Sequence, residues 1–151
     1  MTEWQLTIDC ADPSRMVVFW AAALGYEVAP PPAGYGTWND WYRSVGVPES
    51  ELDPIGDGAD RLVDPTGRGP RIWFQQVPEL KVVKNRLHLD LFVSGGRGTP
   101  IDERVRVVAA RAAELVELGA TVLHRVPVDD GVVGHYGVTL QDPEGTEFCV
   151  T

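Results

Sequence analysis

The sequence predicts an α+β fold built from two successive βαβββ modules, and three observations lead to that prediction. Segments that alternate in polarity, as half-buried strands do, open each half of the chain. In both halves a segment with helical spacing follows and ends at a glycine. Two short motifs then recur in the same order, Leu24 to Val28 matching Leu118 to Val122, and Asp64 to Gly67 matching Asp142 to Gly145. We therefore expect one domain over residues 1–151, with module one at about 1–78 and module two at about 85–151.

The first strand and helix of module one are predicted from residues 4–24. Residues 4–10 alternate, so that one face carries Trp4, Leu6, Ile8 and Cys10 and the other carries Gln5, Thr7 and Asp9. Asp12 can cap the free N–H groups of a helix whose first residue is Pro13. The helix should continue to Leu24 and stop at Gly25, which suits a left-handed cap.

The rest of module one contains an insertion. A second strand begins at residues 26–28, and further strands are expected at 61–63 and 71–77. Between them, residues 30–58 are rich in Pro, Gly and Asp and contain Trp38, Trp41 and Tyr42 at a spacing that suits one or two helical turns. This aromatic group either forms a lid over a ligand or covers the exposed edge of module one.

Module two repeats the pattern. Residues 85–93 alternate as a strand, with Leu87, Leu89, Leu91 and Val93 on one face and His88, Asp90 and Phe92 on the other. An amphipathic helix is expected from Ile101 to Leu118, ending at Gly119. Strands should follow from residue 120, over 136–140 and over 146–150.

Composition limits the classes of partner. The chain of 151 residues is 44% hydrophobic and 23% charged, which is typical of a soluble domain that buries its own core. Its formal charge of -9 opposes binding to nucleic acid or anionic lipid. The sequence shows neither a signal peptide nor a membrane span, so we expect a cytoplasmic protein. Cys10 and Cys149 are predicted to face opposite ways and not to form a disulfide.

Several motifs together resemble the vicinal oxygen chelate superfamily, and in particular its small bacterial glyoxalase-like members. The motifs are Ile8 to Pro13, Phe19-Trp20, Leu24 to Tyr26, Asn85 to Leu91, Asp142 to Gly145 and Glu147 to Val150. The resemblance implies two modules that form a curled mixed sheet around a shared cavity, with the helices outside. In the enzymes of this superfamily it also implies a divalent metal on the cavity face.

The resemblance also implies where metal ligands would stand. The first-strand positions fall on Gln5 and His88, and the last-strand position of module two falls on Cys149, where the enzymes usually have Glu. In module one the corresponding position falls near Trp73 or Gln75. These residues replace the carboxylates that glyoxalase-type chemistry uses, so we expect no glyoxalase I activity and no tightly held metal. A metal, if it binds, would use Gln5 and His88 with Glu147 or Cys149.

Candidate site residues follow from the polar strand faces. His88, Asp90 and Glu147 are the candidate acid–base residues, because an imidazole and a nearby carboxylate can together move protons. For His88 the alternative is a polar wall residue bound to Asp90 or Gln5. The candidate ligand-binding residues are Gln5, Thr7, Asp9, Trp38, Trp41, Trp73, Gln75, Phe92 and Cys149.

Two classes of function fit this set. The first is a small-molecule-binding protein of the bleomycin-resistance type, with a degraded metal site and no favoured cofactor. The second is a lyase, isomerase or dioxygenase that uses a divalent metal or the pair His88 and Asp90. The sequence leaves open which class applies, which ligand binds and whether the chain forms a homodimer.

Overall fold

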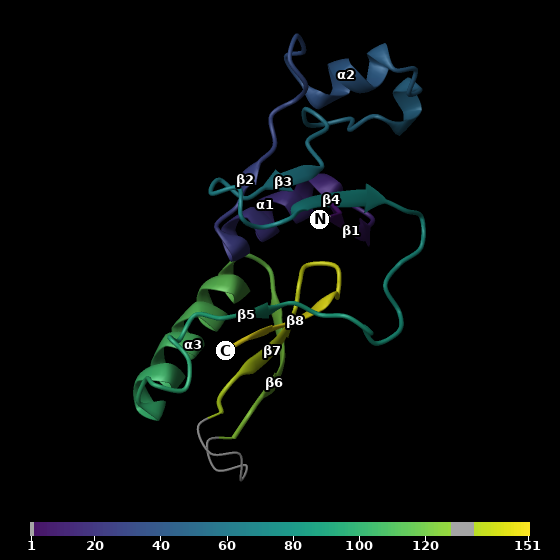
Figure 1. Cartoon of the computed structure of the whole chain (residues 1–151). Coiled ribbons are helices and arrows are strands. Elements are labelled where there is room, and N and C mark those ends of the chain that lie inside the picture. Colours follow the sequence, from purple (N-terminus) through teal and green to yellow (C-terminus); the bar gives the residue numbers. More distant parts are fainter. Residues whose placement is uncertain (1, 128–134) are drawn as a thin grey trace. The chain divides into compact units, whose positions relative to one another are not determined.

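The structure is a computed structural model that describes residues 2–127 and 135–151. The chain divides into two compact units, Met1–Leu80 and Lys81–Thr151, and each is described by itself. Figure 1 labels their helices and strands.

The first unit contains one four-stranded mixed sheet. Its strands are β1 (Gln5–Cys10), β2 (Glu27–Val28), β3 (Arg61–Val63) and β4 (Arg71–Gln76), and its helices are α1 (Pro13–Leu24), α2 (Trp38–Ser44) and a short 3₁₀ turn, η1 (Glu49–Glu51). The strand order is β1-β4-β3-β2, with β1 parallel to β4 and the other pairs antiparallel. Because α2 and η1 lie between β2 and β3, they form the expected insertion.

The second unit repeats this topology. It contains β5 (Asp90–Leu91), α3 (Ile101–Glu117), β6 (Thr121–Arg125), β7 (Val138–Gln141) and β8 (Glu147–Val150), in the sheet order β5-β8-β7-β6. Again the first strand is parallel to the last and the other pairs are antiparallel. The predicted α+β class with two βαβββ modules is therefore confirmed. A cavity shared by the two modules stays a prediction.

The core of the first unit lies between α1 and one face of its sheet (Figure 1). The helix buries Met16, Val17, Phe19, Trp20 and Ala23, which recur in the sequence at helical spacing. They meet a sheet face that buries Leu62, Ile72 and Phe74. Each large apolar side chain removed from water in this way stabilises the unit by about 1.5–3 kcal/mol.

The ends of α1 also match the sequence prediction. The side chain of Asp12 accepts a hydrogen bond from the backbone N–H of Arg15 at 3.1 Å. Gly25 has a φ of 69°, the left-handed conformation that stops the helix and that an L residue adopts only with strain.

The core of the second unit has the same arrangement. Helix α3 buries Val108, Ala112 and Leu115 against its sheet. The sheet contributes the buried side chains of Leu91, Val138, Leu140, Phe148 and Val150. The polar residues of β8, Glu147 and Cys149, alternate with Phe148 and Val150 and so lie on the opposite face.

The expected strand over residues 85–93 is much shorter in the structure. Only Asp90 and Leu91 form β5, and Leu87 and Phe92 are 83% and 84% exposed. The alternating pattern predicts that a segment is extended, but it does not predict over how many residues a neighbouring strand pairs with it. Here the partner, β8, is four residues long, and its backbone hydrogen bonds begin at the carbonyl of Leu89. Leu87 therefore lies before the paired part of the strand, and the expectation that Phe92 contacts a ligand stays a prediction.

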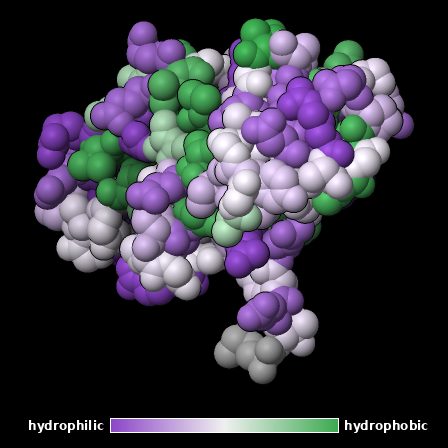
Figure 2. Space-filling model, turned by 90° about the horizontal axis from the view of Figure 1, so that it is seen from above, coloured by the Kyte–Doolittle hydropathy of each residue, from purple (hydrophilic) through white to green (hydrophobic). Residues whose placement is uncertain are grey.

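Apolar side chains also remain at the surface outside the two cores. Ile55 in the insertion and Leu80, Val82 and Val83 near the boundary of the units are all more than three quarters exposed. Figure 2 shows hydrophobic residues among hydrophilic ones on the face that it presents.

Candidate functional site

The sheet face opposite α1 brings together the candidate residues of module one. Neighbouring strands place Gln5 beside Arg71, Thr7 beside Trp73, and Asp9 beside Gln75. Each pair points to the same face because residues in register on parallel strands share a side of the sheet. All six side chains are exposed or half-buried. The predicted polar face of β1 and β4 is thus present.

Four aromatic rings surround the guanidinium of Arg61 on this part of the unit. Its central carbon lies 4.4 Å from the ring centroid of Trp38, 5.4 Å from that of Trp73, and 5.9 Å from those of Trp41 and Tyr42. We call these four rings with Arg61 the aromatic cluster. A cation so close to ring faces is held by their negative electrostatic potential, which contributes about 0.5–2 kcal/mol. The cluster connects β3 and β4 to the insertion.

Asp60 fixes the polar atoms of the aromatic cluster. Its Oδ2 accepts hydrogen bonds from the Tyr42 hydroxyl at 2.5 Å and from the Trp73 indole at 2.8 Å. Its Oδ1 lies 3.2 Å from a terminal nitrogen of Arg61. Burial, reinforced by the hydrogen bond to Asp60 and the charge of its carboxylate, raises the pKa of Tyr42 to about 12. Tyr42 therefore stays protonated, as a donor, at neutral pH.

The structure places the aromatic residues of the insertion unequally. Trp38 is only 7% exposed, and its indole donates to the backbone carbonyl of Ala29 at 2.8 Å. Such burial does not fit the expectation that Trp38 contacts a ligand. It fits the alternative, in which the ring covers the edge of module one. Trp41 and Tyr42 remain half-buried.

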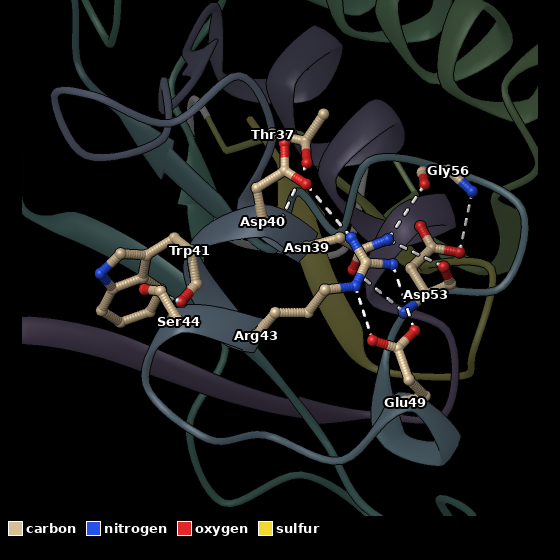
Figure 3. A network of polar contacts seen from close by, with 9 residues as sticks. All are labelled: Thr37, Asn39, Asp40, Trp41, Arg43, Ser44, Glu49, Asp53 and Gly56. Atoms are coloured by element: carbon tan, nitrogen blue, oxygen red, sulfur yellow. Dashed lines mark hydrogen bonds and ion pairs between the residues drawn. The ribbon is translucent and has the colours of Figure 1, made fainter.

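The insertion is held together by its own polar contacts (Figure 3). The side-chain nitrogen of Asn39 donates to the carbonyls of Asp53 and Gly56 at 2.9 and 3.2 Å. Arg43 lies 3.1 Å from Asp40 and 2.6 Å from Glu49. These contacts join α2 to η1 and to the loop after it, so the insertion has a defined shape despite its many Pro and Gly residues.

An open cleft of about 980 Å³ lies between the insertion and β4. Two residues that the sequence predicts as ligand-binding, Trp73 and Gln75, line it. Tyr42, Asp60, Glu51 and Asp53 also line it and were not among the predicted site residues. The acidic, aromatic composition of the insertion was the available signal, but it does not say which of its side chains face inward. Gln5, Thr7, Asp9, Trp38 and Trp41 are not among the lining residues.

In the second unit, the face of the sheet opposite α3 gathers a second group of candidates. Asp90 on β5 is in register with Cys149 on β8, which is in register with Thr139 on β7. His88 precedes β5, and its Nε2 lies 3.3 Å from Oδ1 of Asp90. The Cys149 sulfur lies 3.4 Å from the Thr139 hydroxyl. One ligand atom from each of His88, Asp90 and Cys149 falls within a distance of 4.8 Å of the others.

The sequence matches the family model of the glyoxalase-like domain over residues 5–151. The chain belongs to the glyoxalase-like domain family. The predicted membership of the vicinal oxygen chelate superfamily is thereby confirmed. No curated protein matches the sequence.

Solved structures with the same fold accompany this family match. A hypothetical protein from S. aureus has 15% identity and a TM-score of 0.59, covering 99% of this chain and 92% of its own. A glyoxalase/bleomycin resistance/dioxygenase family enzyme from Burkholderia phytofirmans PsJN has 16% identity and a TM-score of 0.56, covering 97% and 94%. A mutant of the fosfomycin resistance protein FosX from Listeria monocytogenes, complexed with Mn(II) and 1S,2S-dihydroxypropylphosphonic acid, has 12% identity and a TM-score of 0.57, covering 99% and 90%. At these low sequence identities, the similarity shows a shared fold and nothing about function.

Three residues of the second unit of this glyoxalase-like protein could together hold a metal ion, and the expected ligand set of Gln5 and His88 with Glu147 or Cys149 stays a prediction. The side chain of Glu147 is only 12% exposed, and its carboxylate is already engaged in an ion pair with Lys84. Asp90, a candidate acid–base residue, lies close to His88 and Cys149. Gln5 lies on β1 of the first unit. Nitrogen, oxygen and sulfur donors suit a borderline ion such as zinc, so His88, Asp90 and Cys149 fit a divalent metal by donor chemistry.

Within the residues that the structure describes, no helix has both the length and the apolar character needed to cross a membrane.

Proposed function

We propose that this glyoxalase-like protein binds a small molecule in the cleft of its first unit, with sequestration of that molecule as its role. The observation that carries the proposal is the cleft itself, which is lined by aromatic residues, including Tyr42 and Trp73, and by polar residues. Its volume of about 980 Å³ is at the upper end of the range of ligand sites, roughly 300–1,000 Å³.

The side of the cleft at Trp73 supports binding because its geometry is set before any ligand arrives. The Trp73 indole is held by Asp60, and its ring lies 5.4 Å from the Arg61 guanidinium carbon. A ring that is already fixed loses little conformational freedom when a ligand packs on it, and this favours affinity. Gln75, two residues along the same strand and on the same face, adds an amide that can donate or accept.

The test is a screen of small molecules by thermal shift, followed by titration of each hit with intrinsic tryptophan fluorescence. A ligand at a hundred times its Kd should stabilise the folded protein by about 2.7 kcal/mol. Trp73→Phe should weaken binding and remove the fluorescence change. Trp4→Phe, a change of the same type at an exposed residue that does not line the cleft, should do neither. Equal effects of the two substitutions would contradict the proposal.

A second candidate function rests on the cluster of His88, Asp90 and Cys149. A divalent ion held by these three residues would supply Lewis acidity towards a bound carbonyl or similar group. Without metal, Asp90 can orient His88 as a general base, since the two side chains are 3.3 Å apart. The FosX mutant, which has a similar fold, was solved with Mn(II), and this supports the proposal that a divalent metal binds here.

Calorimetric titration with zinc tests the second candidate. His88→Ala should abolish binding, whereas His124→Ala, on β6 and outside the cluster, should not. Zinc binding that survives His88→Ala would contradict the assignment. We also propose that the protein acts in the cytoplasm. Light scattering on the purified chain would show whether it is a monomer or a homodimer.

A further inference from the structure

The charged side chains that line the cleft of the first unit all have the same sign. Asp12, Glu49, Glu51, Asp53 and Asp60 line it, whereas none of its lining residues is Lys, Arg or His. A cleft lined by one sign of charge, with protein on its walls, concentrates the electrostatic field and attracts ions of the opposite sign. The cleft is therefore negative inside.

Only part of this negative charge is neutralised by neighbouring side chains. Glu49 is paired with Arg43 at 2.6 Å, and Asp60 is paired with Arg61 at 3.2 Å. Among the described residues, no ion pair involves Glu51 or Asp53. The Asp53 carboxylate is fixed by the backbone N–H groups of Ile55 and Gly56 at 3.1 and 3.0 Å. The cleft thus keeps negative charge at defined positions.

An independent observation shows what chemistry the aromatic side of the cleft accepts. Tyr42 and Trp73, which line the cleft, belong to the aromatic cluster, and that cluster already holds an organic cation, the guanidinium of Arg61. Aromatic rings and carboxylates are the groups with which proteins recognise alkylammonium and guanidinium ligands. The two kinds of group meet here at Asp60, which accepts from both rings and faces the cation.

We infer that the cleft takes an organic cation, a small molecule with an apolar or aromatic body that carries an amine, guanidine or quaternary ammonium group. This inference rests on the proposed function, because it names the ligand class of the same cleft. The body would pack at Trp73, and the cationic group would lie toward Glu51 and Asp53. An anionic molecule of the same shape would be repelled.

Three probes that share a naphthalene body but differ in charge test the inference on the full chain. They are 2-naphthylmethylamine, which is a cation at neutral pH, 2-naphthylmethanol, which is neutral, and 2-naphthoate, which is an anion. In calorimetry at low salt, the cation should bind about tenfold more tightly than the alcohol, and the anion more weakly than either. The advantage of the cation should shrink in about 1 M salt, where the screening length is about 3 Å.

Two matched charge-reversal variants test whether the preference for the cationic probe comes from the cleft. Glu51→Lys changes an exposed side chain that lines the cleft, and Glu27→Lys makes the same change at an exposed residue of β2 that does not line it. Glu51→Lys should weaken binding of the cation at least about fivefold and leave the alcohol unchanged. Glu27→Lys should change the affinity for the cation by less than about twofold, because screening weakens distant surface charges.

The outcomes separate this inference from the function on which it rests. Equal affinity for the three probes would overturn the inference and leave the cleft a binding site. Equal weakening by Glu51→Lys and Glu27→Lys would also overturn it, because the preference would then come from the net charge of the protein. If none of the probes binds, both the cleft as a binding site and the inference are contradicted.

Discussion

The Trp73 indole donates a hydrogen bond of 2.8 Å to the carboxylate of Asp60, the residue directly before β3. The same carboxylate oxygen accepts from Tyr42 in α2, so a single acid connects the sheet to the insertion. Asp60 is itself buried, which is tolerated because its Oδ2 accepts two hydrogen bonds and its Oδ1 lies 3.2 Å from a nitrogen of the Arg61 guanidinium. Asp60 therefore contributes to the shape of the cleft by joining Trp73 to Tyr42.

Asp60→Ala should lower the free energy of unfolding by about 3 kcal/mol, because it leaves two donors and the Arg61 charge without their acceptor. Urea denaturation measures the change. Asp57→Ala is the control: Asp57 is exposed, and its carboxylate accepts from one backbone N–H, that of Ala59 at 3.1 Å. That variant should cost about 1 kcal/mol or less. Comparable losses in the two variants would mean that the buried pair with Arg61 contributes little.

The stability of the protein should fall in alkaline solution through Tyr42. Its pKa is raised to about 12 in the folded state by burial and by Asp60, whereas an unfolded chain gives a tyrosine its usual value of about 10. The stability that this group contributes is present below about pH 10 and is lost as the pH rises from about 10 to 12. Tyr42→Phe should make the unfolding free energy less dependent on pH in that window. An unchanged slope would contradict the assignment.

Much of the fold could be predicted because it depends on local patterns. The spacing of Met16, Val17, Phe19, Trp20 and Ala23 identifies the buried face of α1, and the repeated motifs identify the second module. The length of β5 could not be predicted in this way. It depends on β8, a strand more than fifty residues away, whose pairing begins only at Leu89. Alternation records which side of a strand is buried and not how far its partner extends.

The candidate sites were predicted in part for the same reason. Strand alternation places Asp90, Glu147 and Cys149 on one face, and the structure has them there. It cannot show that Lys84 neutralises Glu147, because that contact joins residues far apart in sequence. The role of Asp60 could not be predicted from the sequence, since an acid before a strand is typical of an ordinary turn. Its role arises from the way the insertion folds back on the sheet.

Chelators should leave the melting temperature of the purified protein within about 1 °C of its original value. The cluster of His88, Asp90 and Cys149 offers three donors, but the side chains of His88 and Asp90 are about half exposed and already face each other. A tight site usually has ligands that are fixed by further partners, so binding here should be weak and should contribute little to folding. Metal content per chain completes the measurement. Near-equimolar zinc, nickel or iron, or a fall of several degrees in melting temperature on chelation, would contradict this prediction and favour the metal-dependent enzyme.

Acid should destabilise the protein partly through Asp64. Its carboxylate accepts from the backbone N–H groups of Thr66, Arg68 and Gly69 and from the Thr66 hydroxyl, and these bonds lower its pKa to about 2. The stability that they contribute is present above about pH 4 and is lost as the pH falls toward 2. Asp64→Asn, which removes the charge, should flatten the fall in unfolding free energy between these values. Asp57→Asn, whose side chain accepts a single backbone bond, should retain the fall of the unsubstituted chain.

Two glycines of the insertion offer a final test of how the cleft is built. Gly58 has a φ of +80°, and a Cβ there would lie 2.4 Å from the side-chain oxygen of Asn39 and 3.0 Å from its backbone nitrogen. Gly34 has a φ of +97°, but a Cβ there would meet nothing within 4 Å. Gly34→Ala should therefore cost only the backbone strain, about 1 kcal/mol. Gly58→Ala must also displace Asn39 from Asp53 and Gly56 and should cost about 3 kcal/mol.

Because Asn39 and Gly58 line the cleft, Gly58→Ala should also weaken binding of the naphthalene probe that binds best, and Gly34→Ala should not. Urea denaturation and calorimetry measure the two effects, and equal costs with equal affinities would show that the contact of Gly58 with Asn39 does not shape the cleft.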